Sequence, residues 1–185
     1  NIDNTIISLS ERKAAAQRVL ANLLKIQEKK DTLLNDFIPA IRSLGFIPTK
    51  AAIEDITSSG KLQIFKNQNH KKTILNYYVQ QDIRLNIKDE NAKKINEIIW
   101  TNESFTDFGI NEIPKYKNAY NKEVQKLLKS KDWQKDPNNP IFKHVLDHMT
   151  MTVLVCEREK ELLSGIKTDA EALISSIEGE WRLHD

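Results

Sequence analysis

The residues of this chain best suited to chemistry are two histidines, His144 and His148, which stand four positions apart. On a helix this spacing places both imidazoles on one face, where they can meet one metal ion. The zinc-protease form of the pattern also has a glutamate directly after the first histidine, and Val145 stands there instead. We therefore expect a polar, partly exposed helix face at these two residues. They are the metal-ligand candidates, but we predict no metal and no other cofactor.

Two further residues of chemical interest follow on the same segment. Cys156 is the single cysteine, which excludes an intramolecular disulfide. It lies about 80° around a helix from His148 and about 120° from His144, so it is not an obvious third ligand. Because it falls on an apolar seam, we interpret it as a small buried hydrophobe. Glu159 breaks the same seam, and we interpret it as a wet or partner-facing position.

The letters Ser-Ser-Gly-Lys at 58–61 raise the question of a phosphate-binding loop. Such a loop needs a glycine five positions before its Gly-Lys pair, a Ser or Thr after the lysine, and a strand leading in. Asp55 and Leu62 occupy those two positions, and a helix leads in. We interpret Gly60 as the left-handed residue that closes this helix.

Several aromatic residues could stack on a ligand. More often such residues fill core or interface gaps at helix ends, and packing is our prediction for them. They are Tyr77, Tyr78, Trp100, Trp133 and Trp181.

Composition bounds the fold that must position these residues. A chain of 185 residues has the length of one domain, and we predict a single domain over 1–185. With 39% hydrophobic and 29% charged residues, and only 5 Gly and 5 Pro, it favours long helices. The 28 basic and 26 acidic residues are interspersed and not grouped into a basic patch, so we predict no nucleic-acid binding.

Apolar residues recur at alternating three- and four-residue spacing in three long segments, over 6–44, 74–99 and 142–177. The first segment predicts one long helix, nearly as long as the helix of the last segment. Pro39 should kink or end this first helix. Lys13, Gln27 and Lys30 interrupt its stripe, while Gln81 and Lys88 are the polar members of the second.

Shorter signals lie between these segments. Thr49 is placed as the N-cap of a short helix, a loop is expected over 101–114, and a second short helix over 116–128. The fold class is therefore predicted as all-α, an elongated antiparallel helical bundle with three long and about two short helices.

The chain also resembles an uncharacterised family of small bacterial envelope proteins. The resemblance rests on the layout and on three stretches: Ala-Ala-Ile-Glu-Asp-Ile-Thr-Ser-Ser-Gly-Lys-Leu at 51–62, Ile-Leu-Asn-Tyr-Tyr at 74–78, and Ala-Leu-Ile-Ser-Ser-Ile-Glu at 172–178. Its sharpest part is 56–62. In this family one membrane span near the N-terminus precedes a helical soluble region, and no catalytic residues are known. The resemblance implies a periplasmic location at a bacterial inner membrane, with cytoplasmic location otherwise.

No run here approaches the roughly 18 apolar residues of a membrane span, so membrane contact is expected only through a segment outside this chain. We expect a non-enzymatic ectodomain that acts through a protein partner or by self-association. A ligand-sensing bundle of a membrane receptor is the alternative, and a metal-dependent hydrolase using His144 and His148 is the least favoured one. A sensor should have polar groups converging between helices, whereas an interaction module should expose a flat apolar patch.

Overall fold

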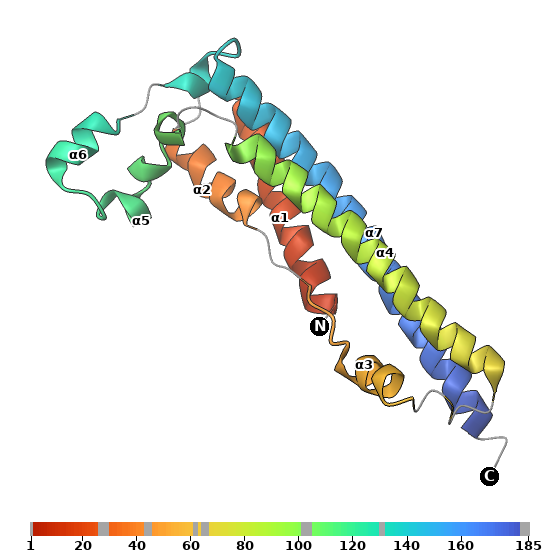
Figure 1. The fold of residues 1–185 in the computed structure, drawn as a ribbon. Coiled ribbons are helices and arrows are strands. Elements are labelled where there is room, and N and C mark those ends of the chain that lie inside the picture. Colours follow the sequence, from red (N-terminus) through yellow and green to blue (C-terminus); the bar gives the residue numbers. More distant parts are fainter. Residues whose placement is uncertain are drawn as a thin grey trace.

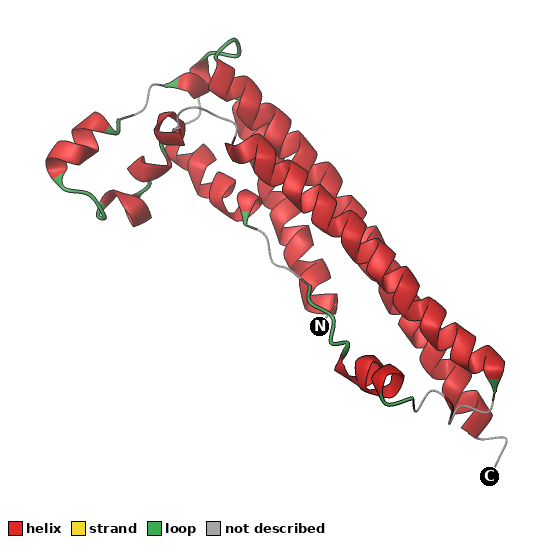
Figure 2. Cartoon of the chain, viewed as in Figure 1, coloured by secondary structure: helices red, strands yellow, loops and turns green. Residues whose placement is uncertain are grey.

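The computed structural model describes residues 2–25, 30–42, 46–60, 63, 67–100, 105–129 and 132–181. Within these ranges the chain is helical and contains no strand (Figure 1; Figure 2), which confirms the all-α class. None of the helices in this part of the chain is long and apolar enough to cross a membrane.

Two long helices run the length of the molecule. They are α4 (Gln68–Trp100, 33 residues) and α7 (Pro140–Trp181, 42 residues), which lie antiparallel and side by side (Figure 1). At 1.5 Å per residue α7 is about 60 Å long, as its apolar seam predicts. The helix α7 also packs against α1 (Ile2–Leu23), so α7 is shared by both pairs.

The N-terminal region differs from the prediction of one long helix. Here α1 ends at Leu23, and α2 (Lys30–Ile41) folds back beside it (Figure 1). The polar interruptions of the stripe explain the break, because folding back lets the apolar residues on either side of them pack together. Pro39 lies inside α2, which ends soon afterwards at Ile41.

The shorter helices correct three more predictions. Where the sequence predicts one helix over 116–128, the chain forms α5 (Pro114–Lys117) and α6 (Lys122–Leu127), and 3₁₀ turns span 105–108 and 110–112 in the predicted loop. The described residues therefore contain seven α-helices, more than the predicted five.

The helix α3 (Ala51–Ser58) confirms its predicted end but not its predicted start. Gly60 has a φ of 71°, the left-handed conformation expected of it. The N-cap is Lys50 and not Thr49, and its side chain makes no capping bond. It reaches instead to Asp82 on α4, with which it forms an ion pair. Lys61 and Leu62 lie outside the described residues.

The α7 seam is buried as predicted from Phe142 to Ile166. Near its start it packs with α1, α2 and Trp133 in one hydrophobic cluster. Further along, Cys156, Leu163 and Ile166 pack with Leu9 of α1 in a second cluster. The candidate residues of α7, which are His144, His148, Cys156 and Glu159, lie along the same helix as these two clusters.

Candidate functional site

The two histidines of α7 lie inside the protein and not on an open face. His148 is 1% exposed, and its ring packs edge-on against Phe37 of α2 with centroids 5.9 Å apart. His144 is half-buried, and its ring packs in the same way against Phe108 at 5.8 Å. The expected partly exposed polar face is thus wrong for His148, because α2 covers α7 there.

This environment keeps His148 neutral. Burial lowers the pKa of its imidazole to about 4, and the neighbouring His144 and Arg12 act in the same direction. The Nε2 atoms of both histidines are buried, and neither has a hydrogen-bond partner among the described residues. Each ring packs against one phenylalanine ring.

A metal centre would need more ligands than these two residues supply. Zinc sites use at least three protein ligands. Within the described ranges no three histidine, cysteine, aspartate or glutamate side chains are grouped to hold a metal ion. The hydrolase alternative therefore has no third ligand in this part of the chain.

Further along α7, Cys156 and Glu159 belong to a buried charged cluster with Arg12 of α1 and Lys88 of α4. Burial raises the pKa of the Cys156 thiol to about 11, so it is a poor nucleophile at neutral pH, and its interpretation as a buried hydrophobe is confirmed. Burial also raises the pKa of Glu159, against the opposing charges of Lys88 and Arg12.

Glu159 corrects the sequence interpretation. It is 2% exposed and lies between helices, not at a wet or partner-facing surface. Its charged neighbours come from α1 and α4, the two helices that pack on α7. The spacing of the seam correctly places Glu159 on the inward side of α7. It does not predict that the cations of Lys88 and Arg12 lie near the carboxylate.

Two other buried polar atoms along the same interior lack a hydrogen-bond partner in the described chain. They are Thr152 Oγ1 on α7 and Gln81 Oε1 on α4. With His148 and the charged cluster they form a column of polar groups inside the helices, which we call the interior polar column: Arg12, Gln81, Lys88, His148, Thr152, Cys156 and Glu159.

The sequence pattern places Gln81, Lys88, Thr152, Cys156 and Glu159 on inward seams, but it predicts neither the burial of His148 nor that of Arg12. The α1 stripe was read with Lys13 in its register, whereas the structure buries Arg12 and leaves Lys13 in a surface ion pair with Glu157. Arg12 donates from Nε to the carbonyl of Ala40 at 2.8 Å. This carbonyl is in the last turn of α2, where no intrahelical donor remains for it.

Among the aromatic residues, Trp133 is fully buried and donates from Nε1 to the carbonyl of Phe108 at 3.2 Å. Its predicted packing role is confirmed. Tyr77 and Tyr78 are half-buried and pack against each other with centroids 5.0 Å apart. The side chains of Trp100 and Trp181 lie outside the described residues.

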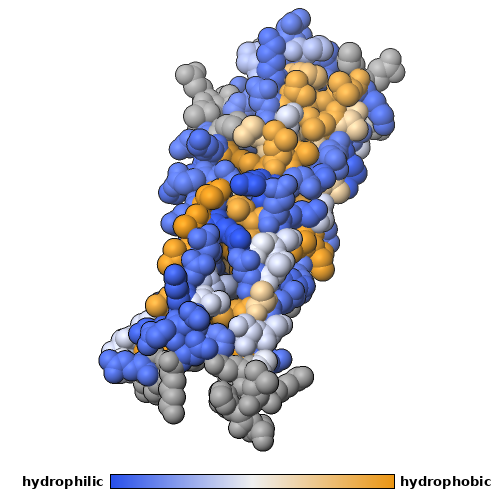
Figure 3. Space-filling model, turned by 90° about the vertical axis from the view of Figure 1, so that its right-hand side faces the viewer, coloured by the Kyte–Doolittle hydropathy of each residue, from blue (hydrophilic) through white to orange (hydrophobic). Residues whose placement is uncertain are grey.

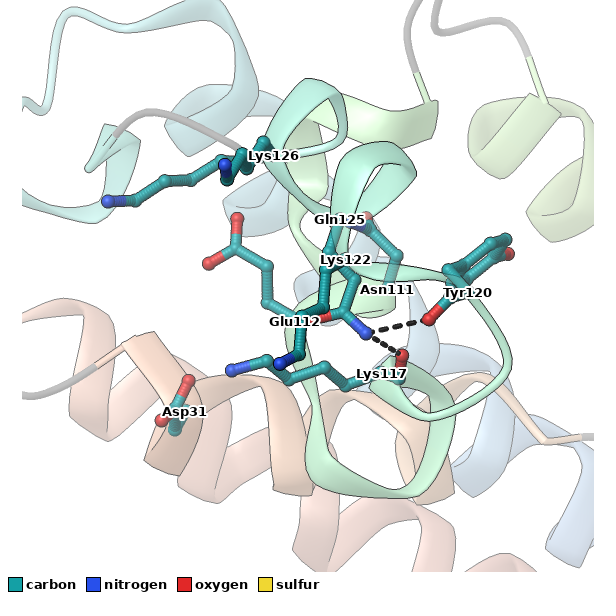
Figure 4. Close-up of a pocket in the computed structure, with 9 residues that line it drawn as sticks. Asp31, Asn111, Glu112, Lys117, Tyr120, Lys122, Gln125 and Lys126 are labelled. Atoms are coloured by element: carbon teal, nitrogen blue, oxygen red, sulfur yellow. Dashed lines mark hydrogen bonds between the residues drawn. The ribbon is translucent and has the colours of Figure 1, made fainter.

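A surface pocket of about 540 Å³ lies away from this column, between the start of α2 and the α5–α6 arm. Four lysines of the arm line it, with Asp31 and Glu112 opposite (Figure 4). Gln125 donates from Nε2 to the carbonyls of Lys117 and Tyr120, at 2.8 and 2.7 Å. All four lysines are exposed and Glu112 is bound by buried Lys30 at 3.0 Å, so no reactive group converges here.

The outer face of α4 is the most unusual surface. Leu75, Val79, Ile83 and Ile87 recur every four residues and are 37%, 54%, 47% and 38% exposed. We call them the α4 outer stripe. Figure 3 views the side on which α4 and α7 run, and hydrophobic side chains reach the surface there between hydrophilic ones.

The stripe points away from the rest of the protein. Gln81 and Lys88, on the opposite side of α4, are buried. The ion pair of Lys50 with Asp82 marks one edge of the stripe, where the segment leading into α3 comes close.

Comparisons of this chain with protein-family models, with curated proteins and with solved structures find no match.

Proposed function

We propose that this chain is a non-enzymatic helical ectodomain of a membrane-anchored bacterial protein, and that it acts by binding another protein surface through the α4 outer stripe. The observation that carries this proposal is the exposure of four large aliphatic side chains on one helix face. Exposed apolar side chains are common singly, but a continuous row of them is typical of an interaction site. In the proposed elongated antiparallel bundle, α7 is the scaffold and α4 presents the binding face.

The distribution of polar groups supports a role without catalysis. His148 is neutral and buried against Phe37, and Cys156 is buried with a raised pKa. The exposed lysines at the α5–α6 arm share their pocket with the carboxylates of Asp31 and Glu112, and Glu112 is bound by Lys30 at 3.0 Å. Among the described residues, the α7 candidates for metal binding or nucleophilic chemistry are thus enclosed.

Membrane anchoring and the periplasmic location come from the resemblance to the envelope family, and they remain predictions. A reporter fused to the end of the natural full-length protein, read for activity on each side of the inner membrane, tests them. Activity only on the cytoplasmic side contradicts the proposed location.

Site-specific photocrosslinking in the native bacterium tests the binding role. A photoreactive phenylalanine analogue at Val79 should give a discrete adduct of higher mass, because that side chain would be buried by the partner. The same analogue at Leu127, which is exposed on α6, is the control and should give none. Absence of adducts from Val79, Ile83 and Ile87 alike would overturn the proposal.

A ligand-sensing bundle is the second candidate, and one observation favours it. Thr152 Oγ1, Gln81 Oε1 and His148 Nε2 are buried in the interior without a hydrogen-bond partner in the described chain. Most buried polar atoms in proteins have a partner, so a bound polar molecule could supply the one that is missing here. A small polar molecule that raises the melting temperature of the parent protein but not of Thr152→Val would support it. An equal shift in both proteins would oppose it.

A further inference from the structure

We propose that the partner of the α4 outer stripe is a second copy of this chain, paired antiparallel about a twofold axis at the level of Gln81. This pairing rests on the proposed function, since it uses the same stripe. It is carried by a symmetry in the exposed residues of α4.

Between positions 75 and 87 the exposed face of α4 reads nearly the same in both directions. Val79 and Ile83 are equally far from position 81, and so are Leu75 and Ile87. Asn76 and Asn86, both exposed, form the next pair about the same position. In an isologous twofold contact, residue i of one copy meets residue j of the other, and residue j meets residue i. Val79 would therefore meet Ile83, Leu75 would meet Ile87, and Asn76 would meet Asn86.

The ends of the face have opposite charge. Lys72 and Glu90 are both exposed, and they are also equally far from position 81. They are 18 residues apart, about five helical turns, so they point in the same direction. Gln81 is half of that interval from each, about two and a half turns, and therefore lies on the opposite side, where it is buried.

An antiparallel pair brings each Lys72 beside the Glu90 of the other copy, twice per dimer. A parallel pair would instead place lysine on lysine and glutamate on glutamate. Glu90 already has an exposed ion pair with Lys93 of its own helix at 2.6 Å, and the partner's lysine would share that carboxylate. The charges thus select the antiparallel arrangement over the parallel one.

The size of the face predicts a weak dimer. From Lys72 to Glu90 the helix is about 27 Å long and about 10 Å wide, which gives about 270 Å² in projection. Stable complexes bury about 800 Å² on each partner. Dimerisation should therefore appear only at high protein concentration, and anchoring in one membrane would favour it by raising the local concentration.

Charge exchange tests the pairing by sedimentation over about 10 μM to about 1 mM protein, the range of weak association. In Lys72→Glu alone or Glu90→Lys alone, two attractions become two repulsions, and the dimer should weaken about tenfold. An equal mixture of the two variants should dimerise as strongly as the parent, because each ion pair is restored between unlike chains. A mixture as weak as the separate variants would overturn the antiparallel pairing.

Cysteine crosslinking gives an independent readout, because Cys156 is buried and should not react. Neither Lys72→Cys alone nor Glu90→Cys alone should form disulfide dimers, since like positions are about 27 Å apart along the helix. The oxidised mixture should form the dimer. Dimers from each variant alone would show a parallel pair and overturn the proposal.

Unfolding is controlled for by Leu154→Asp, a matched change at an exposed leucine of α7. Val79→Asp should abolish the dimer and Leu154→Asp should not, with unchanged helical circular dichroism in both. If the parent is a monomer at about 1 mM while the Val79 photoadduct contains a different protein, the dimer is wrong and the binding role stands. If no adduct and no dimer form, both are wrong.

Discussion

The interior polar column and the α4 outer stripe reverse the usual distribution of residues. The column places Arg12, Lys88 and Glu159 inside the protein, while the stripe places aliphatic side chains such as Val79 and Ile83 on its surface. Both arrangements are costly for an isolated chain, since buried charges lose hydration and exposed aliphatic side chains remain in water. The two regions differ in how the cost is offset.

In the column, the charged groups are compensated in part within the chain. Arg12 has the carbonyl of Ala40, and the charges of Arg12 and Lys88 act on Glu159. In the stripe, the described residues supply no cover, and in the proposed function the partner would supply it. The comparison teaches that polarity alone does not identify a site: in the proposed function the apolar stripe binds the partner, whereas Arg12 of the column holds the end of α2.

The largest expected effect separates the two faces of α4 itself. Ile95 is buried on the inner face, and Ile83 is half-exposed in the stripe. Ile95→Ala should lower the free energy of unfolding by about 2–5 kcal/mol, because a cavity forms in the core. Ile83→Ala should lower it by less than about 0.5 kcal/mol at low protein concentration, where the chain is monomeric.

Urea denaturation of both variants at a few micromolar gives the measurement. Equal losses would mean that Ile83 is part of the monomer core, and the distinction between the two faces of α4 would fail. If the loss of unfolding free energy in Ile83→Ala grows with protein concentration, the outer face of α4 is an intermolecular contact and the distinction between the two faces is strengthened.

A smaller effect concerns His148 at the aromatic end of the column. Its pKa is about 4 in the folded protein, below the ordinary value of about 6.5. The unfolded chain therefore binds the proton more readily, and stability falls as pH drops through 6.5 towards 4. The loss should reach up to about 3 kcal/mol at the acid end.

His148→Phe removes this titration and retains a ring beside Phe37. The difference in unfolding free energy between parent and variant should therefore change with pH between 4 and 6.5 and be constant above 7. A constant difference throughout would mean that His148 is not held neutral by burial.

The sequence predicts the inner faces well because burial leaves a periodic pattern. The α7 seam and the polar members of the α4 seam, Gln81 and Lys88, are where the spacing predicts them. The end of α3 at Gly60 was also predictable, because a left-handed residue favours glycine.

What the sequence could not supply is the fold-back of α2 and its consequences. A 3.6-residue period continues across a break in a helix, so 6–44 resembled one helix. The burial of His148 follows from α2 covering α7, a tertiary contact that spacing does not encode. The stripe is hard to predict for the opposite reason, since α4 carries two apolar faces and spacing does not show which one packs against the rest of the protein.

The smallest of these effects compares two adjacent residues at the edge of the column, Arg12 and Lys13. Arg12 is buried and its Nε satisfies the last-turn carbonyl of Ala40, so it holds the end of α2 against α1. Arg12→Met keeps the apolar volume but removes a charge-assisted hydrogen bond, and should cost about 1.5–3 kcal/mol. Lys13→Met removes a surface ion pair with Glu157 and should cost at most about 1 kcal/mol.

Urea denaturation with hydrogen exchange distinguishes them further. Arg12→Met should also speed amide exchange in α2 selectively, since the end of that helix loses its anchor, while Lys13→Met should leave α2 protection unchanged. If the two variants are equally stable, the buried cation contributes nothing beyond a surface charge. The interior would then not compensate its charges within the chain, and the contrast with the α4 outer stripe would fail.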